Sequence, residues 1–160
     1  MLYVHQDQHH PWRGLLMEVE SCLRLFGGRN ALLTELWNHV QTCTGAHSDT
    51  PLNIALHDNP TAAWWLAKAA PAHELSALLA HSATEKTVLS WLPVHAMDVP
   101  HHLLETFQQC GLEQLDQLCA LPRDAFLRRF GRCLLGELDA GFGKTPLQGF
   151  AGVPLQPPRV

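Results

Sequence analysis

Apolar and polar positions in the first seventy residues follow two different patterns. Residues 15–19 form a short apolar run that is typical of a buried strand, and residues 51–56 alternate as expected of a second strand. Between them, apolar residues recur at helical spacing on one face of a helix with Asn30 as its N-cap, ending near Thr44. Another helix is expected over residues 62–70. The pattern therefore predicts a small unit of strands and helices.

The character of the chain changes after this unit. The last helix of the first unit is expected over residues 74–80. Residues 95–145 contain no strand-like run and are expected to form several short helices separated by glycine or proline. Residues 146–160 are expected to form an extended, proline-rich tail. The predicted fold class is therefore α+β, with an α/β unit over 1–92, a helical unit over 93–145 and a tail.

A glycine turn separates two of the predicted short helices. The helix that carries Phe107 breaks at Cys110-Gly111-Leu112, and a second helix carrying Leu115 follows. An apolar–glycine–apolar turn is typical of a helix–hairpin–helix, because glycine permits the tight turn. The first N–H groups of the second helix are then expected to be unpaired and to bind one DNA phosphate. An ordinary helical hairpin with glycine in its turn is the alternative.

Basic residues gather just after this turn. Four arginines lie within ten residues: Arg123, Arg128, Arg129 and Arg132. They are expected on a short helix with Asp124 as its N-cap and an end near Gly131. The whole chain has a net charge of −4, and residues 95–145 hold five basic and seven acidic residues. Any DNA contact here is therefore expected to be weak and salt-sensitive, and a solvated helix face is the alternative.

Several strings resemble Y-family DNA polymerases, in the same order along the chain. LMEVESCLRLFGG, residues 16–28, is most similar to the palm of the ImuB-type branch, whose members read LEVSGSLRLFGG there. TAAWWLA, residues 61–67, resembles the helix that follows, and residues 92–94 and 111–131 resemble the thumb. Residues 157–159 resemble the link toward the little finger. The resemblance implies a partial ferredoxin-like palm followed by an all-helical thumb with a helix–hairpin–helix.

The resemblance also implies that the chain is not an enzyme. Active members carry an adjacent Asp-Glu pair in the pattern D-E-x-x-L-D-V, and matching the last acidic residue to Glu18 places this pair on Arg13 and Gly14. Neither residue binds Mg²⁺, which requires oxygen ligands, and two-metal phosphoryl transfer needs those carboxylates. Glu18 and Glu20 are a weaker candidate pair of metal ligands, because Glu18 matches a non-catalytic position of the pattern. We therefore expect no catalytic residue, no metal site and no cofactor.

The function implied by the resemblance is that of a non-catalytic DNA-binding adaptor in DNA repair, the SOS response and translesion synthesis. ImuB-type proteins bring an error-prone polymerase and a RecA-like accessory protein to the sliding clamp, so these proteins and the DNA backbone are the implied partners. The implied DNA-binding residues are Gly111, Leu112, Arg123, Arg128, Arg129 and Arg132. The alternative is a protein-interaction module, or a remnant fragment of a longer polymerase-like gene, that no longer binds DNA. An exposed sheet edge and the net negative charge favour this alternative.

Other residue types give weaker signals. No apolar run approaches the ~20 residues of a membrane helix, and we expect a cytoplasmic protein without membrane contact. The five cysteines include no C-x-x-C pair and are expected to be reduced and mostly buried. The histidines, among them His5, His9 and His10, lack a complete set of metal ligands. Adjacent Trp64 and Trp65 cannot both face one core on a helix, so one of them is expected to meet a partner surface.

Overall fold

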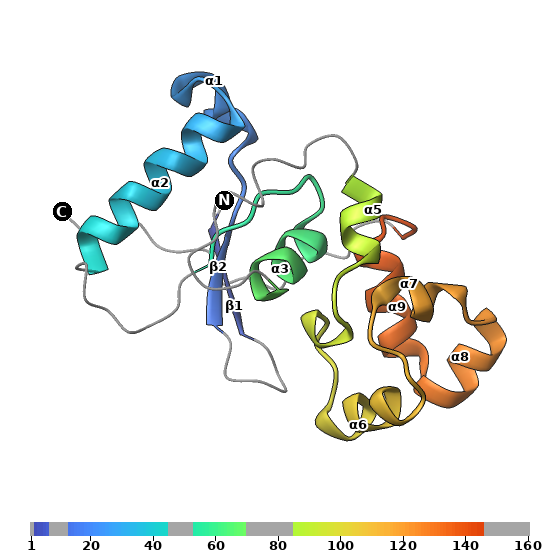
Figure 1. Cartoon of the computed structure of the whole chain (residues 1–160). Helices are drawn as coiled ribbons and strands as arrows, with labels where there is room; N and C mark the ends of the chain where they lie inside the picture. The colour runs from blue at the N-terminus through green and yellow to red at the C-terminus, as the bar shows by residue number, and fades with distance from the viewer. Residues whose placement is uncertain (1, 7–12, 45–52, 70–84, 146–160) are drawn as a thin grey trace.

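The computed structural model describes residues 2–6, 13–44, 53–69 and 85–145. Its elements in chain order are β1 (Leu2–Gln6), β2 (Arg13–Met17), η1 (Glu20–Cys22), α1 (Leu23–Phe26), α2 (Arg29–Thr44), α3 (Pro60–Ala69), α5 (Glu85–Ser90), η2 (Val94–Ala96), α6 (His101–Gln109), α7 (Leu115–Ala120), α8 (Arg123–Phe130) and α9 (Arg132–Gly141). Figure 1 shows the β-hairpin, α1 and α2 on one side, α5 to α9 on the other, and α3 between them. The described part of the chain is therefore α+β, mostly helical with one small sheet.

The sheet is an antiparallel pair of strands. The ladder runs from Leu2 opposite Met17 to Gln6 opposite Arg13. The pattern predicts a strand over 15–19, whereas β2 begins two residues earlier and ends at Met17. The sequence does not predict β1, because it lies in a polar, histidine-rich stretch and its pairing with β2 is a tertiary effect.

Two glycines separate α1 from α2. Gly27 adopts a φ of 79°, and the N–H of Gly28 donates back to a carbonyl of α1 at 2.9 Å, which ends that helix. α2 begins at Arg29, so Asn30 lies inside the first turn and is not the predicted N-cap. The guanidinium of Arg29 forms an ion pair with Asp58 and so ties the start of α2 to the approach of α3.

The prediction of a second strand over 51–56 is wrong for the residues that the structure describes, because residues 53–57 form no strand. Side chains fix this segment instead of strand pairing. Asn53 Nδ2 donates to a backbone carbonyl of α3 at 2.9 Å, and the N–H of Asn59 donates to Nδ1 of His57 at 2.9 Å. Such local bonds from side chain to backbone compete with a sheet ladder. The helix predicted over 74–80 and the tail over 146–160 lie outside the described residues.

Asn59 caps α3 and also joins it to α9. Its Oδ1 accepts the N–H groups of Thr61 at 2.9 Å and Ala62 at 3.2 Å, and Pro60 occupies the first helical position. Its Nδ2 donates to the carbonyl of Ala140 at 2.6 Å. One side chain thus fixes both where α3 starts and where the last turn of α9 lies.

Trp64 and Trp65 are both buried, so the prediction that one of them meets a partner is wrong. The reason is that α3 lies between β2 and α9, so the two indoles pack on different neighbours. A Cβ on Gly14 of β2 would lie 2.5 Å from the Trp64 ring, and a Cβ on Gly141 of α9 would lie 2.0 Å from the Trp65 ring. Each indole therefore packs against a different glycine, where the absence of a side chain leaves room for the ring. The core continues from α3 toward α5 to α9. Its largest fully buried side chains are Trp65, Met97, Val99, Phe107, Leu115, Leu118 and Phe126.

Candidate nucleic-acid interface

Gly111 forms a turn between α6 and α7, at the position that the sequence predicts. Its φ is 69°, a conformation that favours glycine. The N–H of Gly111 donates to the carbonyl of Gln108 at 3.0 Å, and that of Leu112 donates to the carbonyl of Phe107 at 2.9 Å. These two bonds close α6 as a Schellman motif. The side chain of Leu112 packs against the core and holds the turn in place.

The N–H groups that lead into α7 are already paired. Those of Glu113 and Gln114 donate to Oε1 of Gln117, at 2.6 Å and 3.0 Å, and that of Leu115 donates to the carbonyl of Leu92 at 3.0 Å. The prediction that these groups are free for a phosphate is therefore wrong. A capping box and a contact with the segment before η2 satisfy them.

Arg123 joins α8 to α9. Its guanidinium donates to both carboxylate oxygens of Asp139, at 2.8 Å and 2.5 Å, in a bidentate pair. The Asp139 side chain is only 7% exposed, whereas that of Arg123 is 60% exposed. The hydrogen bond from Arg123 holds the pKa of Asp139 below its ordinary value. Asp124 lies inside the first turn of α8 and Pro122 occupies the cap position, so the predicted N-cap is wrong.

Replacing Arg123 with alanine should lower the thermal denaturation midpoint at neutral pH, because it leaves the Asp139 carboxylate buried and unpaired. The lowered pKa of Asp139 gives stability that is present above the ordinary aspartate pKa of ~3.9 and is lost as pH falls through the lowered value. The midpoints of native and Arg123→Ala chains should therefore converge in strong acid. A deficit that is constant over the whole pH range would contradict the ion-pair explanation.

Arg129 lies beside the Gly111 turn. Its Nη2 is 3.5 Å from Sγ of Cys110, and its guanidinium carbon is 5.7 Å from the centre of the Phe130 ring. Both contacts orient the side chain without neutralising it. The turn between α6 and α7 and the last turn of α8 therefore bring one positive charge to the surface next to Gly111.

A second glycine corner joins α8 to α9. Gly131 has a φ of 88° and ψ of 168°, and its N–H donates to the carbonyl of Leu127 at 3.0 Å. α9 begins directly afterwards with Arg132, no side chain caps it, and its first turn contains no acidic residue. A helix N-terminus carries partial positive charge, so an arginine there adds to it instead of compensating for it. Within the described residues, neither Arg128 nor Arg132 forms a hydrogen bond or an ion pair, and both are exposed.

Several of the acidic groups in this part of the chain are already engaged inside the molecule. Asp98 pairs with Lys68, Glu137 accepts two hydrogen bonds inside the molecule, and Asp139 pairs with Arg123. Three of the seven acidic residues in 95–145 are therefore engaged internally. Sequence patterns predict Gly131 only as a helix end and do not predict the open N-terminus of α9, which depends on where the neighbouring side chains point.

Other candidate sites are weaker in the described part of the chain. It holds no group of three His, Cys, Asp or Glu residues that could bind a metal ion. The Oε1 of Glu18 accepts the N–H of Glu20, so this pair serves the turn after β2. All five cysteines are free and exposed, which corrects the prediction that they are mostly buried; Cys110 lies at a turn and the others lie on helix surfaces. Among the described residues, no helix has the length and apolar character to cross a membrane.

No family model matches the chain, and no solved structure matches it. The chain is 28% identical over 130 residues to Protein ImuB of Caulobacter vibrioides strain NA1000 / CB15N, and equally to Protein ImuB of strain ATCC 19089 / CIP 103742 / CB 15. Each match covers 81% of this chain and 26% of the relative, so the chain spans about a quarter of the length of the curated relatives it matches. The resemblance predicted from the sequence is thereby confirmed, and over most of its length the chain is similar to ImuB.

Proposed function

We propose that this chain is a non-catalytic, ImuB-like protein of DNA damage tolerance whose helical unit binds the DNA backbone. In this proposal the β-hairpin with α2 and α3 is part of a palm-like unit, and α5 to α9 are a thumb-like unit with a helix–hairpin–helix. The similarity to ImuB supports the role in DNA repair, the SOS response and translesion synthesis, and we propose that the protein acts in the cytoplasm.

The observation that carries the proposal is the basic corner at Gly131, which we define as Arg128, Arg129, Arg132 and the N-terminus of α9. Three uncompensated guanidinium groups and an uncapped helix end are suited to phosphate oxygens. Contacts of this kind position a protein on DNA without reading its sequence. Gly111 and Leu112 contribute by holding Arg129 through the neighbouring Cys110, and Arg123 contributes by fixing α8 on α9.

The absence of an Asp-Glu pair at the matching positions supports a non-catalytic role. Arg13 and Gly14 occupy those positions in β2, and a side chain at Gly14 would collide with Trp64. A carboxylate at that point of the sheet is therefore incompatible with the packing of β2 on α3. The proposal includes no metal and no cofactor.

A titration of the full chain with a labelled primer–template duplex tests the proposal. Binding should be detectable at low salt, should not depend on base sequence, and should weaken steeply as salt increases, because phosphate contacts release counterions. Primer extension with Mg²⁺ or Mn²⁺ in the same samples should give no product. A chain that does not bind duplex at low salt, or that extends the primer, would contradict the proposal.

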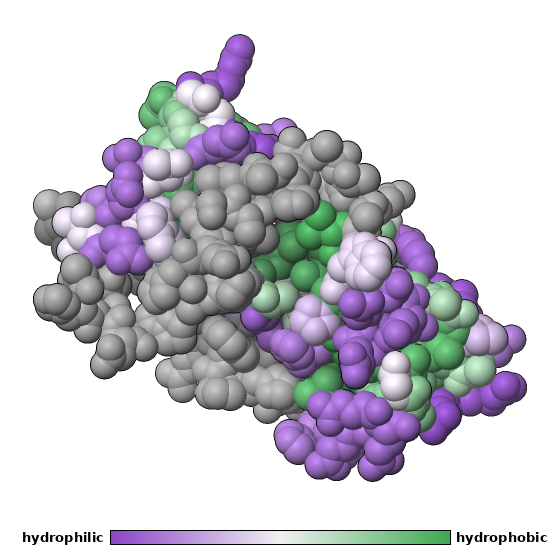
Figure 2. All heavy atoms as spheres, viewed as in Figure 1, coloured by the Kyte–Doolittle hydropathy of each residue, from purple (hydrophilic) through white to green (hydrophobic). Residues whose placement is uncertain are grey.

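A specific observation favours a second candidate function, a docking surface for a protein. Four large apolar side chains are exposed on β2 and α1: Leu15, Met17, Leu25 and Phe26. Leu25 is 88% exposed, and Figure 2 shows hydrophobic atoms at the surface over α1. Patches of this kind mark interaction sites. The partners to test are those that the resemblance implies: an error-prone polymerase, a RecA-like accessory protein and a sliding clamp.

Binding of the purified candidate partners, with and without nuclease, distinguishes the two functions. Complex formation that resists nuclease and is lost in the Leu25→Ser variant would select the docking function. A complex that requires DNA and is unaffected by Leu25→Ser would select the DNA-binding function. Because Leu25 is almost fully exposed, its replacement should not alter the stability of the fold.

A further inference from the structure

α3 packs on two different parts of the molecule. The Trp65 ring lies against Gly141 of α9, and the Trp64 ring lies against Gly14 of β2. The resemblance groups α3 with the strands and α2 in a palm-like unit. The contacts of α3 point to the other grouping, in which it depends on α5 to α9 for its stability.

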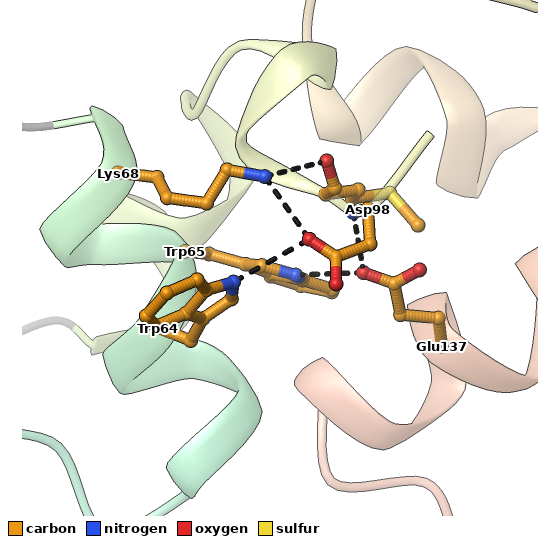
Figure 3. Close-up of polar contacts among 6 residues, drawn as sticks. Trp64, Trp65, Lys68, Asp98 and Glu137 are labelled. Carbon is orange, nitrogen blue, oxygen red and sulfur yellow. Dashed lines mark hydrogen bonds and ion pairs between the residues drawn. The ribbon is translucent and has the colours of Figure 1, made fainter. Parts of the chain in front are cut away.

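Polar side chains of α3 bind to α9 and to the segment after η2. Asn59, which caps α3, donates to a carbonyl in the last turn of α9 at 2.6 Å, and the indole N–H of Trp65 donates to Oε1 of Glu137 at 3.1 Å. Lys68 donates through Nζ to the carbonyl of Met97 at 2.9 Å. Figure 3 shows Trp65 and Lys68 pointing away from α3, with Glu137 reaching toward Trp65 from α9. These bonds fasten both ends of α3 to the helical unit.

The apolar core gives the same grouping. Within the described residues, one buried cluster joins α3, between Ala62 and Leu66, to the helical unit, between Leu89 and Leu138. Leu32 and Leu33 of α2 are also buried, but they lie outside this cluster. α3 therefore buries its apolar side chains in the core of the helical unit.

The β-hairpin and the helices that follow it leave large apolar side chains in water. Leu15 and Met17 of β2 are exposed, and so are Leu25 and Phe26 of α1. A two-stranded sheet is at best marginally stable by itself. Segments with few buried apolar contacts open at a lower free energy than the core of a protein. We therefore expect this part of the chain to open more readily than the helical unit.

We propose that α3 forms one cooperative unit with α5 to α9, and that β1, β2, α1 and α2 open from it as a second unit. The opening separates Gly14 from Trp64 and uncovers the face of the indole ring that is buried in the closed form. α9 keeps its place, and with it the basic corner at Gly131, because Asn59 and Trp65 hold α9 on the side of α3 that stays closed. This conformational device does not depend on the proposed function.

Two variants test the proposal by making the same change on opposite sides of α3. A Cβ at Gly14 would lie 2.5 Å from the Trp64 ring, and a Cβ at Gly141 would lie 2.0 Å from the Trp65 ring. Neither glycine has a positive φ, so alanine acts through its Cβ and displaces its own neighbour from α3. The measurement is native-state hydrogen exchange of the full chain and of the Gly14→Ala and Gly141→Ala variants.

Gly14→Ala should speed exchange of the β2 and α2 amides by about tenfold or more, while the amides of α3 and α9 keep their native rates. Gly141→Ala should speed exchange of α3 and α9 together. Equal acceleration of α2, α3 and α9 by Gly14→Ala would show a single cooperative unit and would overturn the proposal. Acceleration of α9 without α3 in Gly141→Ala would overturn it as well.

The native chain supplies a second test, which does not depend on the folding of either variant. When guanidinium is added below the unfolding transition, the opening free energies of the α3 amides should converge with those of α9. The β2 and α2 amides should converge on a lower value. Convergence of α3 with β2 and α2 would contradict the proposed grouping. None of these measurements uses DNA, so they succeed or fail independently of the proposed function.

Discussion

Replacing Gly141 with alanine should destabilise the fold by about 3 kcal/mol or more. A Cβ at this position would lie 2.0 Å from Cη2, 2.1 Å from Cζ3 and 2.7 Å from Cζ2 of Trp65. That indole is completely buried and its N–H is held by Glu137, so it has no direction in which to move. The substitution must push α9 away from α3 or force the indole out of the core. Chemical denaturation of the two chains measures the loss.

Gly136 provides a matched control on the same helix. A Cβ at Gly136 meets nothing within 4 Å, and its backbone is that of an ordinary helical residue. Gly136→Ala should therefore stabilise the chain by about 0.5–1 kcal/mol, because alanine loses less backbone entropy in a helix. Equal effects of the two substitutions would show that α9 does not pack on Trp65 as described.

Replacing Arg128 and Arg132 together with alanine should weaken binding to a primer–template duplex at low salt by about tenfold or more. These two side chains are exposed and have no partner in the described part of the chain, so their removal takes nothing from the fold. The loss should appear equally on duplexes of different sequence, because phosphate contacts carry no base information. Fluorescence anisotropy with two unrelated duplexes measures both expectations.

Arg24→Ala is the matched control for charge. Arg24 is also exposed and lies on α1, on the side of the molecule opposite the helices α5 to α9 (Figure 1). Its removal changes the net charge in the same direction but leaves the basic corner intact, so the affinity should be close to that of the native chain. An equal loss in both variants would indicate a diffuse effect of net charge and would contradict a defined interface.

Local signals predict several elements correctly, because the cause of each element lies in its own residues. The apolar repeat after residue 30 predicts α2, the helix expected over 62–70 corresponds to α3, and the glycine between Phe107 and Leu115 predicts the turn between α6 and α7. The strands are less well predicted, because their pairing depends on segments distant in the chain. β1 has no apolar alternation of its own, and residues 53–57 are fixed by side-chain hydrogen bonds that the pattern does not reveal.

The candidate interface is predictable in position but not in detail. A cluster of arginines in an acidic chain indicates where to look, and three of the four are exposed and flank the turn at Gly131. The fourth, Arg123, pairs with Asp139, sixteen residues further on, which no local pattern predicts. The glycine turn at Gly111 also differs in function from the expectation, because Gln117 and the Leu92 carbonyl already satisfy the N–H groups that follow it.

The salt dependence of DNA binding tests directly whether the basic corner at Gly131 contacts the phosphate backbone. The measurement is the slope of log Kobs against log salt concentration, for the native chain and for the Arg128→Ala/Arg132→Ala variant on one duplex. Each phosphate contact contributes about 0.9 to this slope, so the native slope should be steeper by about 1.8. Identical slopes for the two chains would show that these arginines do not contact phosphate, and would contradict the claim.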